Sequence, residues 1–365
     1  MTESHDSGLE FVSCDLCYTT HKPSFDKDPN TLQSQTPLPI IINGKRVKTI
    51  DVHAHCQVSA ALELVKGRPE VAGVTLAGAD FSRVENIPSR LKDMDAMGID
   101  MQALSITVFQ HFHWAEKELA SEIARIQNEK LSEICGEYPD RFVALGTVSL
   151  QHPELATEQL EYSVRKLYHR GVMITASVND DELSNPKFNQ FWAKAEELEA
   201  VVLIHPQHFK AATKRFEGRG FLSNIIGNPL DTTVALAHLI YEGVLDQHPN
   251  LKVIGAHGGG LLPSYIGRYD HGHNSNDRGG RGLEKKKPSE YLKQLYFDSL
   301  VYSTENLKHL INECGVSQIV LGTDHPAGMA NINPIAHLLS INGLSDDDIE
   351  AICNGNLRKL LKINT

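Results

Sequence analysis

The chain has 365 residues, of which 41% are hydrophobic and 22% are charged, as in an ordinary globular protein. This length suits one large α/β barrel or two ordinary domains. A formal net charge of −11 and a pI near 5.9 argue against nucleic acid or an anionic membrane as a partner, because both bind basic surfaces. No apolar run reaches the roughly 20 residues that span a bilayer, and the N-terminal MTESHDSGLE lacks the segments of a signal peptide. We therefore expect a cytoplasmic protein.

The first 46 residues differ in composition from the rest of the chain. They are polar and rich in Pro, Ser and Thr, so we expect an N-terminal arm over residues 1–46 and a single folded unit over residues 47–365. Within the arm, Cys14 and Cys17 form a CxxC pair with histidines nearby, which is half of a zinc site. The chain has no second CxxC and no HxxxH, so free thiols are the favoured interpretation.

After the arm, short β-branched runs alternate with helical patterns. Eight such runs predict strands of a largely parallel sheet. They are Val47–Val52, Met101–Val108, Phe142–Val148, Val172–Ile174, Val201–Ile204, Leu251–Gly255, Leu295–Ser299 and Gln318–Gly322.

The segments between these runs have the apolar spacing of amphipathic helices, as at Leu119, Ile123 and Ile126. Ser184-Asn185-Pro186 is typical of a helix start, and Ser345 followed by Asp348 predicts a capping box. Eight strand–helix units favour a (β/α)₈ TIM barrel of the metal-dependent hydrolase type, with a doubly wound open sheet as the alternative.

The first strand runs into two histidines, His53 and His55. Residues two apart on a strand share a face, so both imidazoles point the same way at the end where barrel enzymes place their sites. Two surface histidines are the simpler explanation for this motif on its own.

Three further strands end in metal-binding residue types. The run at residues 201–204 ends in His205, the run at 251–255 is followed by His257, and the last run is followed by Asp324. The carboxyl ends of barrel strands meet at one mouth, so we expect these side chains to converge on one divalent cation.

Three imidazoles and one carboxylate suit Zn²⁺, with Mn²⁺, Fe²⁺ or Co²⁺ as alternatives. His257 is then the additional histidine. Beside a metal-bound water it suits the role of general base better than that of a fifth ligand.

Many stretches of the chain resemble the amidohydrolase superfamily, and its amidohydrolase-2 branch of metal-dependent non-oxidative decarboxylases in particular. They include DVHAH, RLKDMDAMGIDMQALS, DRFVALGTVSLQHPELA, LIHP, LKVIGAHGGG, YLKQLYFDSLV and VLGTDHP, and the likeness runs from about residue 47 to residue 360.

This resemblance implies that His53, His55, His205 and Asp324 hold the metal and that His257 activates water. The fourth strand ends in Thr175 where binuclear members carry a lysine, which implies a single ion. The His-x-His motif, in place of Glu-x-His, is similar to branch members that act on muconate-type acids.

The resemblance also implies four substrate-binding residues. Arg268 is expected to hold the substrate carboxylate, reaching in from a neighbouring subunit of a homodimer, although a surface salt bridge is the alternative. Gln207 and His208 follow the His-Pro of the fifth strand, where relatives have an aromatic residue. Arg83 is the candidate for a second arginine, at a shifted spacing.

The expected reaction is decarboxylation of a hydroxy- or amino-substituted aromatic, heteroaromatic or muconate-type carboxylic acid. Either Asp324, which would then be ligand and proton carrier together, or His257 supplies the proton. Hydrolysis of a C–C bond, lactone or amide by the same site is the alternative, and a catalytically silent barrel is a third hypothesis.

Overall fold

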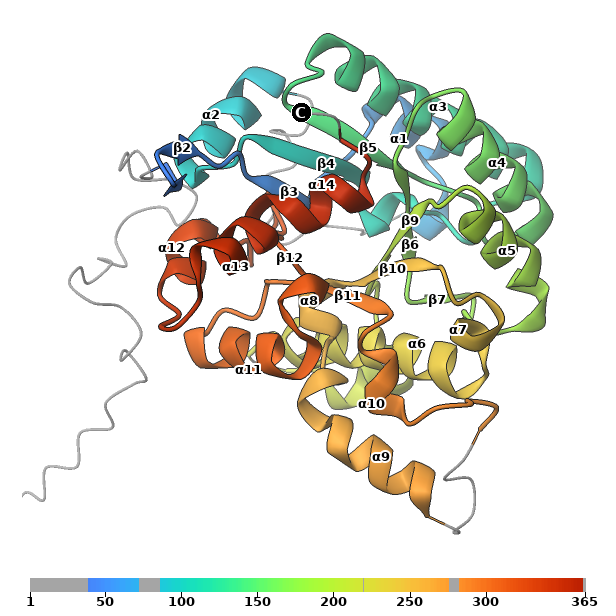
Figure 1. The fold of residues 1–365 in the computed structure, drawn as a ribbon. Helices are drawn as coiled ribbons and strands as arrows, with labels where there is room; N and C mark the ends of the chain where they lie inside the picture. Colours follow the sequence, from blue (N-terminus) through green and yellow to red (C-terminus); the bar gives the residue numbers. More distant parts are fainter. Residues whose placement is uncertain (1–38, 72–85, 219, 276–281, 364–365) are drawn as a thin grey trace, which may run out of the picture.

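A computed structural model describes residues 39–71, 86–218, 220–275 and 282–363 (Figure 1). The predicted arm falls almost entirely outside these residues, as do Cys14 and Cys17. Its described part is a hairpin of β1 (Ile41–Ile42) and β2 (Lys45–Arg46), turned at Asn43 and Gly44 with positive φ. The domain boundary at residue 46 remains a prediction.

Eight parallel strands form one sheet at the centre of the molecule. Its order is β12-β11-β10-β9-β6-β5-β4-β3. The strands are β3 (Ile50–Cys56), β4 (Met101–Ile106), β5 (Phe142–Gly146), β6 (Gly171–Thr175), β9 (Val201–His205), β10 (Lys252–Gly255), β11 (Leu295–Asp298) and β12 (Ile319–Val320).

The first and last of these strands close the sheet through hydrogen bonds rather than a regular ladder. Val52 N donates to Leu321 O (3.0 Å), Asp324 N to His53 O (2.8 Å) and His55 N to His325 O (2.7 Å). The sheet is therefore a barrel, and the prediction of a (β/α)₈ fold is confirmed over the open-sheet alternative.

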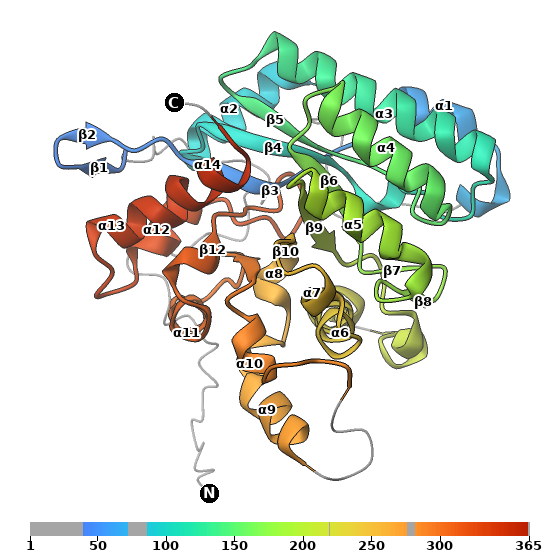
Figure 2. The same ribbon diagram turned by 45° about the vertical axis from the view of Figure 1, so that its right-hand side comes forward.

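Helices surround the barrel on its outer face (Figures 1 and 2). The longest, α3, buries Ile123, Leu131 and Ile134 against the sheet. The helices are α1 (Ser59–Val65), α2 (Ile87–Met97), α3 (Lys117–Glu137), α4 (Pro153–Arg165), α5 (Asn189–Glu197), α6 (Asn228–Tyr241), α7 (Val244–Gln247), α8 (Ala256–Gly259), α9 (Ile266–Asn274), α10 (Pro288–Tyr291), α11 (Thr304–Cys314), α12 (Pro334–Leu339), α13 (Asp346–Glu350) and α14 (Asn356–Leu360). A small hairpin of β7 (Ser177–Val178) and β8 (Asp181–Glu182) lies outside the barrel. None of the helices in the described ranges is long and apolar enough to cross a membrane.

The first strand differs from its predicted bounds. Strand pairing starts at Ile50 because the Thr49 N–H and hydroxyl bond Asp100, and it continues through His55 to Cys56 beside β4. The histidines therefore lie within the strand. The helix start predicted at Ser184-Asn185-Pro186 is a short 3-10 helix, Pro186–Phe188, which leads into α5. Asn185 caps it, since its side chain accepts from Lys187 N.

The predicted capping box is present, since Ser345 and Asp348 bond each other's backbone N–H groups.

The buried His169 generates a prediction about pH. It is 3% exposed beneath Gly146, and burial lowers its pKa to about 4 from the ordinary 6.5. Between these two pH values the unfolded chain binds a proton that the folded protein does not. The free energy of unfolding is therefore highest above pH 6.5 as far as His169 is concerned. It decreases as the pH falls towards 4, by about 3 kcal/mol.

Denaturant unfolding at several pH values checks this. We expect His169→Gln to have a shallower loss of unfolding free energy between pH 6.5 and 4 than the unsubstituted protein. An identical slope in the two proteins would contradict the assignment.

Candidate metal centre

Strand β3 directs two imidazoles to the same point. Its pairing with β4 shifts register between Asp51 and Ala54, and His53 lies in that bulge. Despite the bulge, the Nε2 atoms of His53 and His55 lie 3.1 Å apart. The two-residue spacing thus gives the shared face that the sequence predicted.

Two other strands complete the cluster. His205, the last residue of β9, places its Nε2 3.2 Å from Nε2 of His55. Asp324 follows β12, and its Oδ1 lies 3.4 Å from His53 Nε2 and 3.1 Å from His55 Nε2. All four side chains are at least nine-tenths buried. The structure therefore brings together the four residues named as ligands.

The spacing of these donor atoms fits one cation. Zinc–nitrogen bonds of about 2.0–2.1 Å in a tetrahedron separate the donors by about 3.3–3.4 Å. Four separations between donor atoms of this cluster span 3.1 to 3.4 Å. A divalent ion can thus be held without large rearrangement of the side chains.

Hydrogen bonds on the far side of two rings leave Nε2 free to ligate. His53 Nδ1 lies 2.7 Å from Asp298 Oδ2, and His205 Nδ1 lies 2.7 Å from Pro206 O. Both oxygens accept, so each Nδ1 carries a hydrogen, and Nε2 is the nitrogen of each ring that a metal ion would bind.

The electrostatics of the cluster favour a positive charge at its centre. Burial alone lowers the pKa of His53, but the carboxylates of Asp324 and Asp298 outweigh it and raise that pKa to about 10. Burial and neighbouring imidazoles lower the pKa values of His55 and His205. The carboxyl of Asp324 is buried, yet His53 and His257 hold its pKa well below the usual range. A proton on His53 thus takes the place that a cation would fill.

His257 lies beside this cluster in a strained turn. It has φ 54°, and its Nε2 is 3.7 Å from Asp324 Oδ2, the oxygen that does not face His53 and His55. Glycines must follow it, because a Cβ on Gly258 would lie 2.4 Å from Val301 and one on Gly260 2.0 Å from the backbone of Pro229.

Five side chains therefore compete for one ion. Single donor atoms of His53, His205, His257 and Asp324 lie within 4.8 Å of one another, and His55 lies closer still to three of them. We favour His55 as the fourth ligand because its contacts match coordination spacing. His257 then remains available for proton transfer.

Asp298 is a site residue that sequence reasoning missed. It ends β11, accepts from His53, and also accepts from the backbone N–H groups of His257 (3.0 Å) and Gly258 (2.8 Å). One carboxylate therefore orients a proposed ligand, His53, and the turn that carries the proposed base, His257. Its position at a strand end was the available signal.

His113 is a second such residue. Its Nε2 lies 2.8 Å from the hydroxyl of Thr175, which pairs in register with His205, so His113 stands at the barrel mouth. Burial lowers its pKa to about 4, which keeps the ring neutral.

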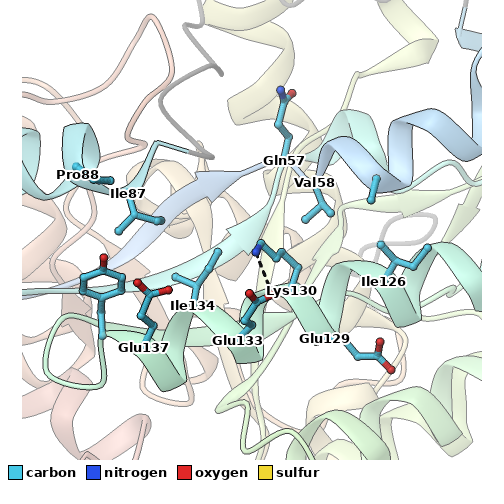
Figure 3. Close-up of a pocket in the computed structure, with 12 residues that line it drawn as sticks. Gln57, Val58, Ile87, Pro88, Ile126, Glu129, Lys130, Glu133, Ile134 and Glu137 are labelled. Carbon is cyan, nitrogen blue, oxygen red and sulfur yellow. Dashed lines mark hydrogen bonds and ion pairs between the residues drawn. The ribbon is translucent and has the colours of Figure 1, made fainter.

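A cavity of about 330 Å³ adjoins the metal cluster. Its lining combines His257 and Asp324 with neutral polar and apolar residues, among them Tyr302, Asn224 and Leu261. None of the described residues lining it is a lysine or an arginine. A larger cavity of about 810 Å³ lies between the start of α2 and the glutamates of α3, and none of the metal donors lines it (Figure 3).

The predicted substrate-binding residues are dispersed. Gln207 donates to Val108 O (3.1 Å) at the rim, and the exposed His208 contacts Thr213 (2.9 Å). Arg268 is exposed on α9 and lines an outer groove rather than the cavity beside His257. Arg83 lies outside the described residues.

Comparison with known proteins agrees with this geometry. The model of the amidohydrolase family matches residues 50–363. The 2-amino-3-carboxymuconate-6-semialdehyde decarboxylase of Dictyostelium discoideum is 31% identical over 275 residues, which cover 75% of this chain and 76% of that protein. This chain therefore belongs to the amidohydrolase family, as its motifs predicted.

Two solved structures share the fold. A 2,6-dihydroxybenzoate decarboxylase bound to 2,6-dihydroxybenzoate superposes with a TM-score of 0.75 at 26% identity, covering 87% of this chain and all of that one. A dihydroxybenzoic acid decarboxylase from Polaromonas sp. JS666, with bound manganese and 2-nitroresorcinol, gives 0.76 at 25% identity over 87% of this chain and 98% of that one. The relatives support a divalent metal, and the expected decarboxylase class.

Metal content should separate ligands from the base. We expect His205→Ala to lose most bound metal while remaining folded, because the residue ends its strand at the barrel mouth. We expect His257→Ala to keep about one ion per chain but to turn over roughly 10²–10⁴-fold more slowly, the usual contribution of an acid–base group.

Elemental analysis of both purified variants is the measurement, and circular dichroism controls for folding. A full complement of metal in His205→Ala would remove that residue from the ligand set. Parallel loss of metal and activity in His257→Ala would make His257 a ligand.

Proposed function

We propose that this protein is a metal-dependent, non-oxidative decarboxylase of a hydroxy- or amino-substituted aromatic, heteroaromatic or muconate-type carboxylic acid. The observation that carries the proposal is the cluster of His53, His55, His205 and Asp324 at the mouth of the barrel, beside a cavity lined by His257. Decarboxylases among the relatives support it.

The ion that we propose is one divalent cation, with Zn²⁺ favoured by the three imidazoles. Manganese in the Polaromonas relative makes Mn²⁺ the first alternative. When bound, the cation supplies Lewis acidity towards a carboxylate or an ortho oxygen of the substrate.

The chain's own residues have to move one proton. Direct loss of CO₂ from an sp² carbon would leave an in-plane carbanion, so that carbon must be protonated first. The C–C bond then breaks as its electrons return to the π system. Asp324 and His257 both line the cavity, with carboxylate oxygen and imidazole nitrogen 3.7 Å apart, and either can deliver the proton.

The same donors and the same histidine suit a hydrolase acting on a C–C bond, a lactone or an amide. The two activities differ in product. A decarboxylase releases CO₂ and returns a product 44 Da lighter, whereas a hydrolase adds the elements of water.

Small aromatic, heteroaromatic and muconate-type acids should therefore be incubated with metal-loaded protein and followed by mass spectrometry. We expect a loss of 44 Da from at least one acid that depends on the metal and is absent in Asp324→Ala. Gain of water without CO₂ would establish the hydrolase instead.

The substrate carboxylate needs a cationic partner besides the metal, and we propose that Arg268 of a neighbouring subunit supplies it. On its own chain Arg268 lies outside the cavity, among Leu261 and Tyr265, which are 41% and 59% exposed. Exposed apolar side chains around a guanidinium suit a subunit contact. The proposed assembly is a homodimer.

The helix that carries Arg268 is well anchored for such a role. Ser289 donates to the carboxylate of Asp270 through both N–H (2.9 Å) and hydroxyl (2.7 Å), and His273 contacts the buried Glu284 at 2.6 Å. The rigid helix fixes the backbone of Arg268, so only its side chain has to be ordered when the guanidinium binds a carboxylate.

Complementation tests the shared site. We expect Arg268→Ala and His205→Ala homodimers each to be nearly inactive, because every site lacks one part. Mixed dimers should regain part of the activity, since one of their two sites then has both the metal donors and the arginine.

Differently tagged subunits allow the mixed dimers to be purified before the assay. Arg268→Lys is the matched variant, since it keeps the positive charge but cannot form two parallel hydrogen bonds to a carboxylate. Absence of any recovery in purified mixed dimers would place Arg268 outside the partner's site.

A further inference from the structure

Four polar side chains lie beneath the metal cluster with no solvent exposure. They come from four different elements: Arg90 from α2, Gln102 from β4, Asp51 from β3, and Thr323 from the segment after β12. Polar groups buried to this degree cost free energy unless they are hydrogen-bonded. Their partners therefore indicate what they do.

The four side chains form one continuous chain of hydrogen bonds. Arg90 Nε donates to Gln102 Oε1 (2.9 Å), and Gln102 Nε2 donates to Asp51 Oδ2 (2.9 Å). The hydroxyl of Thr323 donates to the same carboxylate oxygen at 2.6 Å. We call these four residues the support cluster.

Asp51 also binds the backbone beside two proposed ligands. Its Oδ1 accepts from His53 N (3.0 Å) and from Thr323 N (3.1 Å). The His53 N–H lies in the bulge of β3, where the ladder to β4 is interrupted, so the side chain of Asp51 supplies its partner. A single carboxylate thus fixes both sides of the barrel closure.

The second backbone contact bears on Asp324. Asp324 follows Thr323 directly and has φ 61°, a conformation that a non-glycine residue holds only when its surroundings impose it. Asp51 bonds Thr323 through both N–H and hydroxyl, and Asp324 N donates to His53 O (2.8 Å).

Arg90 reaches the remaining ligand of β3. Its Nη1 donates to the carbonyl of His55 at 2.9 Å, while burial lowers the pKa of its guanidinium. Its Nη2 is buried without a hydrogen-bond partner. An apolar side chain would fill this space at lower cost, so stability alone does not account for an arginine here.

We propose that the support cluster positions the metal donors, acting through the backbone of His53, His55 and Asp324 without touching the ion. The inference rests on the metal centre proposed above. It predicts that weakening the cluster lowers metal affinity and distorts coordination beyond any general loss of stability.

Thr323→Val tests this, because it keeps the shape of the side chain and removes its bond to Asp51. The matched control is Thr49→Val. Thr49 is also a buried threonine that bonds an aspartate, Asp100, through both N–H (2.9 Å) and hydroxyl (3.2 Å), but it precedes β3 at the opposite end of the barrel. Thr323→Ser restores the hydroxyl.

Co²⁺ is the probe. Its affinity is measured by competition with a chelating dye, its coordination by the visible absorption spectrum, and stability by the melting temperature of the metal-free proteins. We expect Thr323→Val to bind Co²⁺ about 10–100-fold more weakly, as for other residues that support ligands, with an altered spectrum. Thr49→Val should keep the parent affinity and spectrum, and Thr323→Ser should recover both.

Asp51→Asn is the second variant if Thr323→Val does not fold, since it keeps the shape and one acceptor oxygen. It should weaken Co²⁺ binding in the same direction. Parent affinity and spectrum in the Thr323 or Asp51 variant, or an equal loss in Thr49→Val, would overturn the inference. If the unsubstituted protein itself bound no Co²⁺, the result would contradict the proposed metal centre and not the role of the support cluster.

Discussion

The closure of the barrel between β3 and β12 is the constraint on which the site depends. His53 and His55 come from the first barrel strand and Asp324 from the segment after the last, so these donors meet only when the barrel closes. The closing contacts are backbone bonds such as Asp324 N to His53 O, together with the Asp51 carboxylate. The fold and the metal cluster are thus formed by the same contacts.

The charges of the buried side chains also favour a cation at the centre of the cluster. Three imidazoles and a carboxylate are buried together, with four donor separations of 3.4 Å or less, and the carboxylates of Asp324 and Asp298 raise the pKa of His53 to about 10. Asp298 accepts a hydrogen bond from Nδ1 of that ring and another from the backbone N–H of His257, so it fixes both the ring and the neighbouring turn. A divalent ion would satisfy the same charge and leave His257 free at the edge of the cavity.

Sequence reasoning predicted the architecture because its signals are local. Each β-branched run is a barrel strand in the structure, and polar residues at the ends of parallel strands necessarily share one mouth. The start of the first strand was wrong because it is set by Asp100, a residue distant in sequence that takes the bonds of Thr49. Asp298 lies at the end of a predicted strand but was not identified as a site residue, because its role depends on contacts with His53 and the turn of His257. His113 lies outside the predicted strands, and its place at the barrel mouth depends on its contact with Thr175.

The roles of the residues are less accessible to sequence than their positions. Spacing placed His53, His55, His205, His257 and Asp324 together, but it does not separate ligands from the base. That separation depends on which carboxylate oxygen each ring faces, a matter of backbone conformation at two residues with positive φ. The position of Arg268 on the outer surface likewise depends on how α9 packs.

Anomalous X-ray scattering at the manganese edge, from crystals of Mn²⁺-loaded protein, tests the central claim most directly. We predict one peak per chain, within coordination distance of His53, His55, His205 and Asp324, with the ring of His257 outside that distance. A peak elsewhere, no peak, or His257 in the place of His55 would contradict the account.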